Sequence, residues 1–257
     1  AGGYQDEARQ AARKAIEAAG TSAANRARAW YYLGTLEQSQ RNWKAAADAY
    51  GETISISPTQ PLLQVARGVV LWQNGDREGA ERAFSGAART KPDDPQLMEA
   101  LGKSHLQIER FPEAVAFLRQ ASDLQPDNIN LSLTLALAWE KAGDERAALG
   151  HYEKILQDRP TSLEARNNLA MLLATCSDPS LRDGQRALAL ATEVNGQTKG
   201  TNPASLHTLA AAQAENDDLP AAIKTLDKAI AIARATGQGP LVTKLRERRQ
   251  TYLVARE

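Results

Sequence analysis

Residues 30–58 read WYYLGTLEQSQRNWKAAADAYGETISISP, and residues 64–92, one period later, read QVARGVVLWQNGDREGAERAFSGAARTKP. The two stretches carry a glycine, an alanine, an aromatic residue and a closing proline at the same places. A repeat of this kind is the first feature to establish, because it decides the architecture of the whole chain. The proline continues the period at intervals of 34 residues, at Pro58, Pro92, Pro126 and Pro160.

Each period is predicted to fold as two helices. Spacings of three and four residues put Trp30, Leu33 and Gly34 on one stripe of a first helix, and Ala46 and Tyr50 on one stripe of a second. The closing proline ends the second helix, because proline has no backbone N–H and disfavours the helical conformation before it. The chain is therefore expected to be a row of antiparallel helix pairs.

A small residue recurs in the middle of every predicted first helix. Glycine inside a helix costs about 1 kcal/mol relative to alanine, so its recurrence indicates that another helix crosses too closely for a side chain. The alanines of the second helix are expected to face this crossing. The positions are Gly34, Gly68, Gly102, Ala136, Ala170 and Ala210.

The pattern Trp30-x2-Leu33-Gly34, followed by Ala46, Tyr50 and the closing proline, resembles the tetratricopeptide repeat. The resemblance covers nearly the whole chain. It implies an all-α fold, a single right-handed superhelical solenoid of antiparallel helix pairs with a C-terminal capping helix. The predicted repeats span residues 23–60, 61–94, 95–128, 129–162, 163–202 and 203–236, and the capping helix spans 237–257.

Three segments depart from the regular repeat. Residues 163–202 exceed one period, which predicts a longer turn between Thr175 and Gly184, and residues 203–236 lack a closing proline. Residues 1–22 match only the second helix of a repeat, so we expect this orphan helix to belong to a repeat of a longer protein. The closing segment resembles the end of many bacterial proteins of this family, and Glu257 is expected to lie near the natural C-terminus.

Composition and charge narrow the function classes. Lys plus Arg and Asp plus Glu each number 31, so the formal net charge is zero. A neutral chain lacks the electrostatic footprint of a nucleic-acid-binding protein. The longest apolar stretch, around Leu131 to Trp139, is much shorter than a membrane span, so no direct membrane insertion is expected. Neither feature distinguishes the cytoplasm from the periplasm.

The sequence predicts neither an enzyme nor a bound cofactor or metal. His105, His151 and His207 fall in different repeats, with no cysteine or second histidine at ligand spacing. Cys176 lies in the long turn without a nearby histidine to lower its pKa, and we interpret it as an inert thiol.

The predicted capping helix is rich in basic residues, with Lys244, Arg246, Arg248 and Arg249 around Glu247. Positive charge is favoured near a helix C-terminus, so a solvated outer face is the first interpretation. A site for a membrane surface or an acidic partner is the second.

The resemblance also implies where a partner would bind. First helices line a concave groove in tetratricopeptide arrays, so positions between the structural ones are the candidates, and an apolar patch there marks an interaction site. Trp72 is expected to contribute most, because tryptophan is enriched at interface hot spots. The alternative is that the apolar candidates are core between adjacent repeats. The candidates are Tyr31, Leu62, Val65, Val69, Trp72, Glu99, Lys103, Leu133, Leu137, Glu140 and Asn167.

Two function classes follow from the sequence. The first is a protein–protein interaction scaffold that holds a protein or peptide segment in the groove. The second is an accessory or regulatory region of a larger enzyme or of a cell-envelope or secretion protein. The Lys/Asn/Arg clamp that chaperone-binding relatives use for a peptide carboxylate is not matched, so the residues identify no particular partner.

Overall fold

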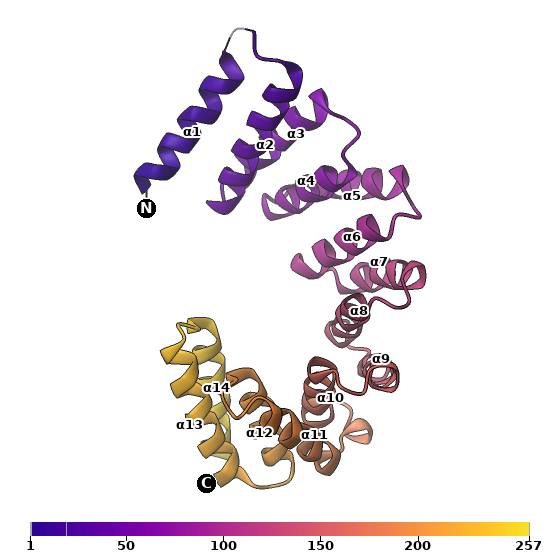
Figure 1. Ribbon diagram of the computed structural model, residues 1–257, viewed down its shortest axis with the longest axis vertical. Coiled ribbons are helices and arrows are strands. Elements are labelled where there is room, and N and C mark those ends of the chain that lie inside the picture. The colour runs from indigo at the N-terminus through magenta and orange to yellow at the C-terminus, as the bar shows by residue number, and fades with distance from the viewer. Residues whose placement is uncertain (1, 19, 257) are drawn as a thin grey trace. The chain divides into compact units, whose positions relative to one another are not determined.

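The computed structural model describes residues 2–18 and 20–256, which form α-helices and one short 3₁₀ helix (Figure 1). Neighbouring helices form pairs in tandem, which confirms the predicted all-α repeat fold. The chain divides into two compact units, residues 1–134 and 135–257, and the division falls within α8 (Ile129–Lys141).

The first unit contains α1 to α7 and the start of α8. Helix α2 pairs with α3, α4 with α5, and α6 with α7, while α1 packs on α2. The bounds are α1 (Gly2–Glu17), α2 (Ala23–Ser39), α3 (Trp43–Ile56), α4 (Pro61–Gln73), α5 (Arg77–Thr90), α6 (Pro95–Gln107) and α7 (Phe111–Leu124).

The second unit contains the rest of α8 and the helices after it. Helix α10 pairs with α11 and α12 with α13, and α14 packs on α13. The bounds are α9 (Glu145–Asp158), α10 (Leu163–Thr175), the 3₁₀ helix η1 (Pro179–Leu181), α11 (Gly184–Gln197), α12 (Pro203–Glu215), α13 (Leu219–Ala235) and α14 (Gly239–Arg256).

The close crossing inferred from the recurring glycine is present in the first unit. A Cβ atom added to Gly68 would lie 2.6 Å from the ring of Phe84, and one added to Gly102 would lie 2.5 Å from Cγ of Leu118. The side chain nearest each glycine is thus the large residue four positions after the predicted alanine. Ala114 itself approaches Gly102 with its backbone oxygen, at 3.2 Å from the added Cβ.

Proline ends four of the second helices, as predicted. The residue before each of these prolines leaves the helix with an extended φ between −135° and −148°. Helix α13, which no proline closes, runs for 17 residues, whereas these four helices have 14 each. The four pre-proline residues are Ser57, Lys91, Gln125 and Arg159.

Polar caps begin the helices that follow. Asp76 accepts a hydrogen bond from the backbone N–H of Gly79 at the start of α5, and Asp94 accepts from those of Gln96 and Leu97 at the start of α6. Gly75, with φ of 88°, makes the left-handed turn between α4 and α5. The helix boundaries within and between repeats are therefore fixed by local backbone chemistry.

The two ends of the described chain are held differently. On α1, the Arg9 Nε–H donates to Oε1 of the buried Glu37 at 2.7 Å, while Ala8 and Ala15 are exposed. On α14, Val242, Leu245 and Tyr252 are buried in one cluster with residues of α12 and α13.

Candidate partner-binding surface

The first helices of the first unit expose apolar side chains. Tyr31 of α2 is 42% exposed and Leu62 of α4 is 52% exposed. Both belong to the predicted partner-binding residues. Covering water-exposed apolar surface lowers the free energy of the system, so these two side chains indicate where a partner could bind.

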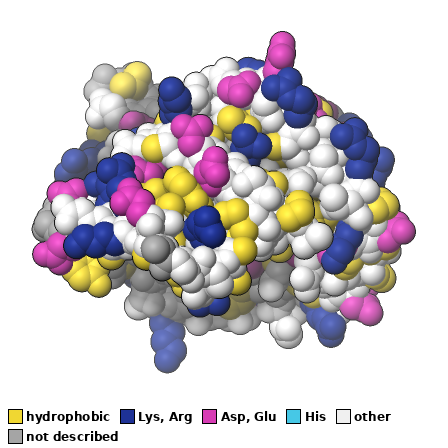
Figure 2. Space-filling model, turned by 90° about the horizontal axis from the view of Figure 1, so that it is seen from above, with side chains coloured by type: hydrophobic (Ala, Val, Ile, Leu, Met, Phe, Trp, Pro, Cys, Tyr) yellow, Lys and Arg dark blue, Asp and Glu magenta, His cyan; other side chains and the backbone are white. Residues whose placement is uncertain are grey.

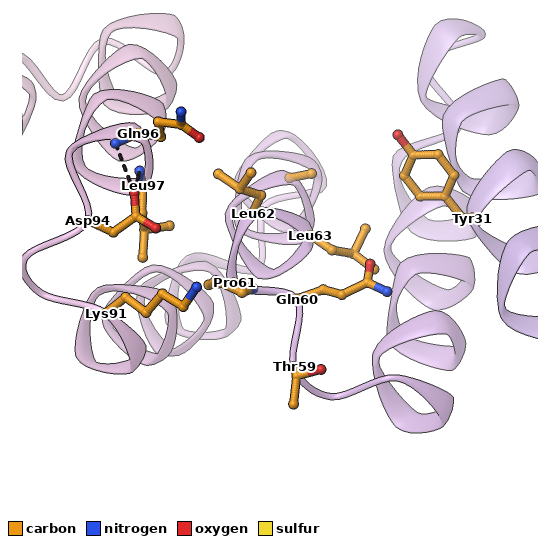
Figure 3. Close-up of a pocket in the computed structure, with 11 residues that line it drawn as sticks. Tyr31, Thr59, Gln60, Pro61, Leu62, Leu63, Lys91, Asp94, Gln96 and Leu97 are labelled. Carbon is orange, nitrogen blue, oxygen red and sulfur yellow. Dashed lines mark hydrogen bonds between the residues drawn. The ribbon is translucent and has the colours of Figure 1, made fainter. Parts of the chain in front are cut away.

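Tyr31 and Leu62 line a hollow of about 520 Å³ (Figure 3). This volume lies in the range of small-molecule and peptide side-chain pockets. We call it the α2–α6 hollow, because α2, α4 and α6 and the linkers before α4 and α6 build it. Its lining residues are Tyr31, Thr59, Gln60, Pro61, Leu62, Leu63, Ala66, Lys91, Asp94, Gln96 and Leu97.

The linkers between repeats form the polar part of the hollow. Lys91 leaves α5 in an extended conformation, and Asp94 then caps α6, so the two opposite charges come to one side of Leu62 in Figure 3. Gln60 immediately precedes α4 and lies between Leu62 and the helix that carries Tyr31 in the same view. The hollow thus combines an apolar centre with hydrogen-bonding groups around it, as in peptide-binding interfaces.

A second hollow of about 330 Å³ adjoins the first, because Tyr31 and Gln60 line both. Arg28 and Thr53 are also part of its lining. The Tyr31 ring lies 6.2 Å from that of Tyr50, whose hydroxyl donates to Gln38 at 2.6 Å. Burial raises the pKa of Tyr50 to about 12, so this hydroxyl stays protonated as a donor.

Charge is mixed on one face of the molecule. On the face shown in Figure 2, Lys and Arg side chains alternate with Asp and Glu side chains, with hydrophobic side chains between them. This pattern agrees with the zero net charge. Among the described helices, none is long and apolar enough to cross a membrane.

Three predicted contact residues lie in the core instead. Val65 is 3% exposed, Val69 is 4% exposed and Leu133 is 7% exposed, so a partner cannot reach these side chains. Helix α4 packs against α3, α5 and α6, and it buries residues around most of its circumference. We therefore leave Val65, Val69 and Leu133 out of the candidate surface. These three residues belong to the core, as the alternative interpretation of the apolar candidates expected.

Trp72 is half-buried at the end of α4, and its ring already has partners within the chain. The guanidinium carbon of Arg77 lies 3.8 Å from the ring centroid and that of Arg110 lies 5.1 Å away. Such cation–π contacts hold the indole in place. Trp72 is not among the residues that line the α2–α6 hollow.

The two charged candidates of α6 pair with each other. Nζ of Lys103 lies 2.5 Å from Oε1 of Glu99, one helical turn away. Glu99 is half-buried and Lys103 is exposed. Because their charges compensate, neither contributes a free charge to the rim of the hollow.

The remaining candidates belong to the second unit. Leu137 is 39% exposed, and Glu140 accepts a hydrogen bond from the Tyr152 hydroxyl at 3.5 Å. Burial raises the pKa of Glu140 above its usual range. Asn167 is half-buried, and its Oδ1 atom is buried without a hydrogen-bond partner. None of these residues lines the α2–α6 hollow.

Sequence reasoning missed polar residues of the hollow, namely Gln60, Lys91 and Asp94 of the linkers and Gln96 at the start of α6. The sequence does contain a signal for them: they lie within four residues of the recurring Pro58 and Pro92. A proline that ends one helix just before the next begins brings the end of one repeat beside the start of its successor.

The histidines and the cysteine have structural surroundings. Nδ1 of His105 lies 2.8 Å from the Leu101 carbonyl oxygen, and the His151 ring stacks on Trp139. Cys176 is buried, and burial raises the pKa of its thiol. Within residues 2–18 and 20–256, no group of three or more His, Cys, Asp or Glu side chains is placed to hold a metal ion.

Comparison of the sequence with known families decides what the repeat is. The sequence profile of the family described as Tetratricopeptide repeat matches residues 5–61 and 65–129. The helix pairs continue in tandem through the second unit. The chain is a tetratricopeptide repeat protein.

Among known tetratricopeptide structures, one from Parabacteroides merdae superposes with a TM-score of 0.61 at 14% identity, covering 94% of this chain and 91% of the other. The pilF protein of Pseudomonas aeruginosa gives a TM-score of 0.54 at 18% identity, covering 95% and 99%. At these identities the likeness shows the fold alone.

A sequence relative is much longer than this chain. The putative cellulose synthase operon protein C of Escherichia coli O157:H7 is 25% identical over 245 residues, which cover 77% of this chain and 20% of that protein. The chain therefore spans about a fifth of the length of this relative.

Proposed function

We propose that the protein is a protein–protein interaction scaffold and that its α2–α6 hollow binds an extended segment of a partner polypeptide. The observation that carries the proposal is the exposed pair Tyr31 and Leu62 on the wall of one hollow. The repeat family supports a scaffold role, since repeat arrays present extended binding surfaces. Tyr31 and Leu62 replace Trp72 as the residues expected to contribute most.

The lining suggests the chemistry of the segment. An apolar side chain of the partner would occupy the space beside Leu62 and Ala66, where Leu63 and Leu97 complete the wall. The side-chain amides of Gln60 and Gln96 each offer a donor and an acceptor for the backbone of an extended segment. Opposite charges on Lys91 and Asp94 would favour a partner with a polar or mixed-charge flank over a strongly charged one.

The magnitudes allow moderate affinity. Fully burying a leucine side chain stabilises by about 1.5–3 kcal/mol, and Leu62 has half of its surface left to bury. Several contacts of this size must offset an association cost of about 4–15 kcal/mol. Binding in the micromolar range, near −8 kcal/mol, is therefore expected.

The test begins with peptides selected from a displayed library against the immobilised protein. Their affinity is measured by fluorescence anisotropy for the wild type, Leu62→Ser and Tyr31→Ser. We expect each substitution to weaken binding by about fivefold or more, because each removes apolar contact in the hollow. Thermal melts should stay unchanged, since both side chains are exposed.

Leu124→Ser is the matched control, because Leu124 of α7 is also an exposed leucine of the first unit and does not line the hollow. This variant should bind the selected peptides like the wild type. Equal loss of affinity in Leu62→Ser and Leu124→Ser would contradict the proposed location of the site.

A second candidate function is favoured by the long relative. Because the Escherichia coli protein is about five times the matched length, these repeats would serve as an accessory region of a larger enzyme or of a cell-envelope protein. The name of that relative refers to a cellulose synthase operon, so a carbohydrate-synthesis assembly is the setting to test. Co-purification of the full-length gene product with a synthase subunit would support this function. Loss of this co-purification in Leu62→Ser would show that the hollow takes part.

A further inference from the structure

Basic residues of α14 differ in whether a carboxylate compensates them. Nε of Arg249 lies 2.6 Å from Oδ1 of Asp227. Within residues 135–256, no carboxylate oxygen lies within 4.0 Å of Lys244 or Arg248. Arg248 is half-buried, so its charge is less well solvated than that of an ordinary surface arginine.

Lys244 and Arg248 are four residues apart and lie one turn from each other on the same side of the helix. They flank the buried Leu245, and the guanidinium carbon of Arg248 is 6.0 Å from the Tyr252 ring centroid. The pair therefore borders the core that α14 forms with α12 and α13.

His207 of α12 directly follows Leu206, which belongs to the same buried cluster as Leu245 and Tyr252 of α14. It is 5% exposed, and its Nε2 atom is buried without a hydrogen-bond partner. Burial first, and then the charges of Lys244 and Arg248, lower the pKa of His207 to about 4. The imidazole is therefore neutral at physiological pH, and both cations act on it.

We propose that Lys244 and Arg248, with His207 behind them, bind a carboxylate side chain of an acidic segment of a partner polypeptide. The two uncompensated cations supply the charge, and the buried imidazole behind them has no hydrogen-bond partner at Nε2. The guanidinium of Arg248 can donate two parallel hydrogen bonds to one carboxylate. We call this group the α14 cation pair.

Acidic side chains of the protein itself act on this region only from a distance. Lys244 lowers the pKa of Glu140, which burial raises overall, and Glu215 raises the pKa of Tyr252. Glu215 is already 3.5 Å from Arg182. The α14 cation pair therefore keeps a positive charge for a ligand.

A polypeptide fits this pair better than a membrane surface does. Two cations beside a buried histidine form a local site for one carboxylate, whereas membrane-binding surfaces use clusters of about four to eight basic residues. The α14 cation pair lies in the second unit and shares no residue with the α2–α6 hollow, so either proposal can fail alone.

The test uses the whole chain and two blocked peptides, one alternating glutamate with alanine and one with glutamine in place of glutamate. Fluorescence anisotropy at low salt should show binding of the glutamate peptide only. Arg248→Ser and Lys244→Ser should each weaken it by about tenfold. Arg248→Lys keeps the charge but loses the parallel pair of hydrogen bonds, so it should weaken binding less than Arg248→Ser does, which separates loss of charge from loss of structure.

Arg246→Ser is the matched control, because it removes one charge from an exposed residue of the same helix. It should change the affinity by less than about twofold. Equal weakening by Arg246→Ser and Arg248→Ser would mean diffuse attraction and would overturn the proposal, as would equal binding of the two peptides or no binding of the glutamate peptide.

Two further measurements assign the site. The His207 ring, followed by NMR during a pH titration, should show its pKa rise by about one unit or more when the glutamate peptide is bound, and no rise in Arg248→Ser. An unchanged pKa in the bound wild type would overturn the role of His207. Phosphatidylserine-containing vesicles that bind through Lys244 and Arg248, when the peptide does not, would identify a membrane ligand and overturn the proposal.

Discussion

Four buried polar side-chain atoms have no hydrogen-bond partner in the described chain, and all four belong to the second unit, whereas exposed large apolar side chains are concentrated in the first. The unpartnered atoms are Trp139 Nε1, Asn167 Oδ1, Asn195 Oδ1 and His207 Nε2. The exposed apolar residues of the first unit are Tyr4, Tyr31, Tyr32, Leu62 and Leu124, against Leu137 and Val254 in the second.

Together the two proposals give one repeat fold two kinds of binding chemistry. When a partner covers an exposed apolar side chain, the free energy of the complex is lowered. An unpartnered buried polar atom costs about 1–3 kcal/mol, which a ligand recovers only by supplying a hydrogen bond. The first unit should therefore favour apolar segments and the second unit polar ones, while the expected preference for acidic segments comes from the charges of Lys244 and Arg248.

The small residue at the helix crossing also differs between the units: it is glycine at positions 34, 68 and 102 and alanine at positions 136, 170 and 210. Substitution of a crossing glycine gives the largest expected effect on stability. Gly102→Val places its Cβ 2.5 Å from Leu118 and 3.2 Å from the Ala114 carbonyl oxygen. The crossing cannot open without moving α6 and α7 apart, so the free energy of unfolding should fall by about 3 kcal/mol. Urea denaturation measures this loss.

Gly150→Ala is the control for that substitution. Gly150 lies inside α9 of the second unit, and a Cβ atom added there meets no atom within 4 Å. Alanine should stabilise the helix by about 0.5–1 kcal/mol. Similar losses at Gly102 and Gly150 would show that the crossing glycines have no special role.

The second prediction concerns His207, the buried histidine of the second unit whose Nε2 atom has no hydrogen-bond partner. The pKa of His207 is about 4 in the folded chain and about 6.5 when unfolded. The unfolded state therefore binds more protons between these values, so stability is present above pH 6.5 and is lost as the pH falls towards 4. At pH 5 the loss should be about 2 kcal/mol relative to pH 7.

His207→Leu removes this pH dependence and the unpartnered Nε2 atom together. Thermal melts from pH 7 to pH 5 should therefore fall less steeply for His207→Leu than for the wild type. Parallel curves for the two proteins would mean that His207 keeps an ordinary pKa in the folded state.

The regular part of this fold could be read from sequence because period and residue type recur together. Gly68 indicated a close crossing, and Pro92 indicated the end of a helix; each follows from backbone chemistry that acts locally. The side chain that covers the glycine, Phe84, was placed in the right helix, although the alanine was expected to face the crossing.

The binding surface was less predictable, because exposure depends on how many neighbours a helix has. A stripe spaced by three and four residues does not show that α4 packs against three helices, which bury Val65 and Val69 while Leu62 stays exposed. The part of the hollow formed by Lys91 and Asp94 depends on the path of the chain between repeats. Side-chain periodicity carries no information about that path.

Trp72 gives the third prediction, because it shows whether apolar binding surface extends along α4. Its contacts with Arg77 and Arg110 contribute about 0.5–1 kcal/mol each at a partly exposed site. Trp72→Ala should therefore lower the free energy of unfolding by about 1–2 kcal/mol, measured by urea denaturation, and Trp72→Phe by less. If Trp72→Ala leaves stability unchanged but abolishes binding of the selected peptides, the site includes the end of α4.

The smallest effect on stability is expected for the exposed leucines, one in each unit, and this pair tests the comparison most directly. Leu62 and Leu137 are 52% and 39% exposed, so Leu62→Ser and Leu137→Ser should each change the free energy of unfolding by less than about 0.5 kcal/mol. Peptides selected for the α2–α6 hollow should bind Leu62→Ser about fivefold more weakly, because half a leucine side chain contributes about 1 kcal/mol. The same peptides should bind Leu137→Ser like the wild type. Equal weakening in both variants would show that binding of these peptides does not depend specifically on Leu62, and the division into an apolar and a polar binding unit would then be wrong.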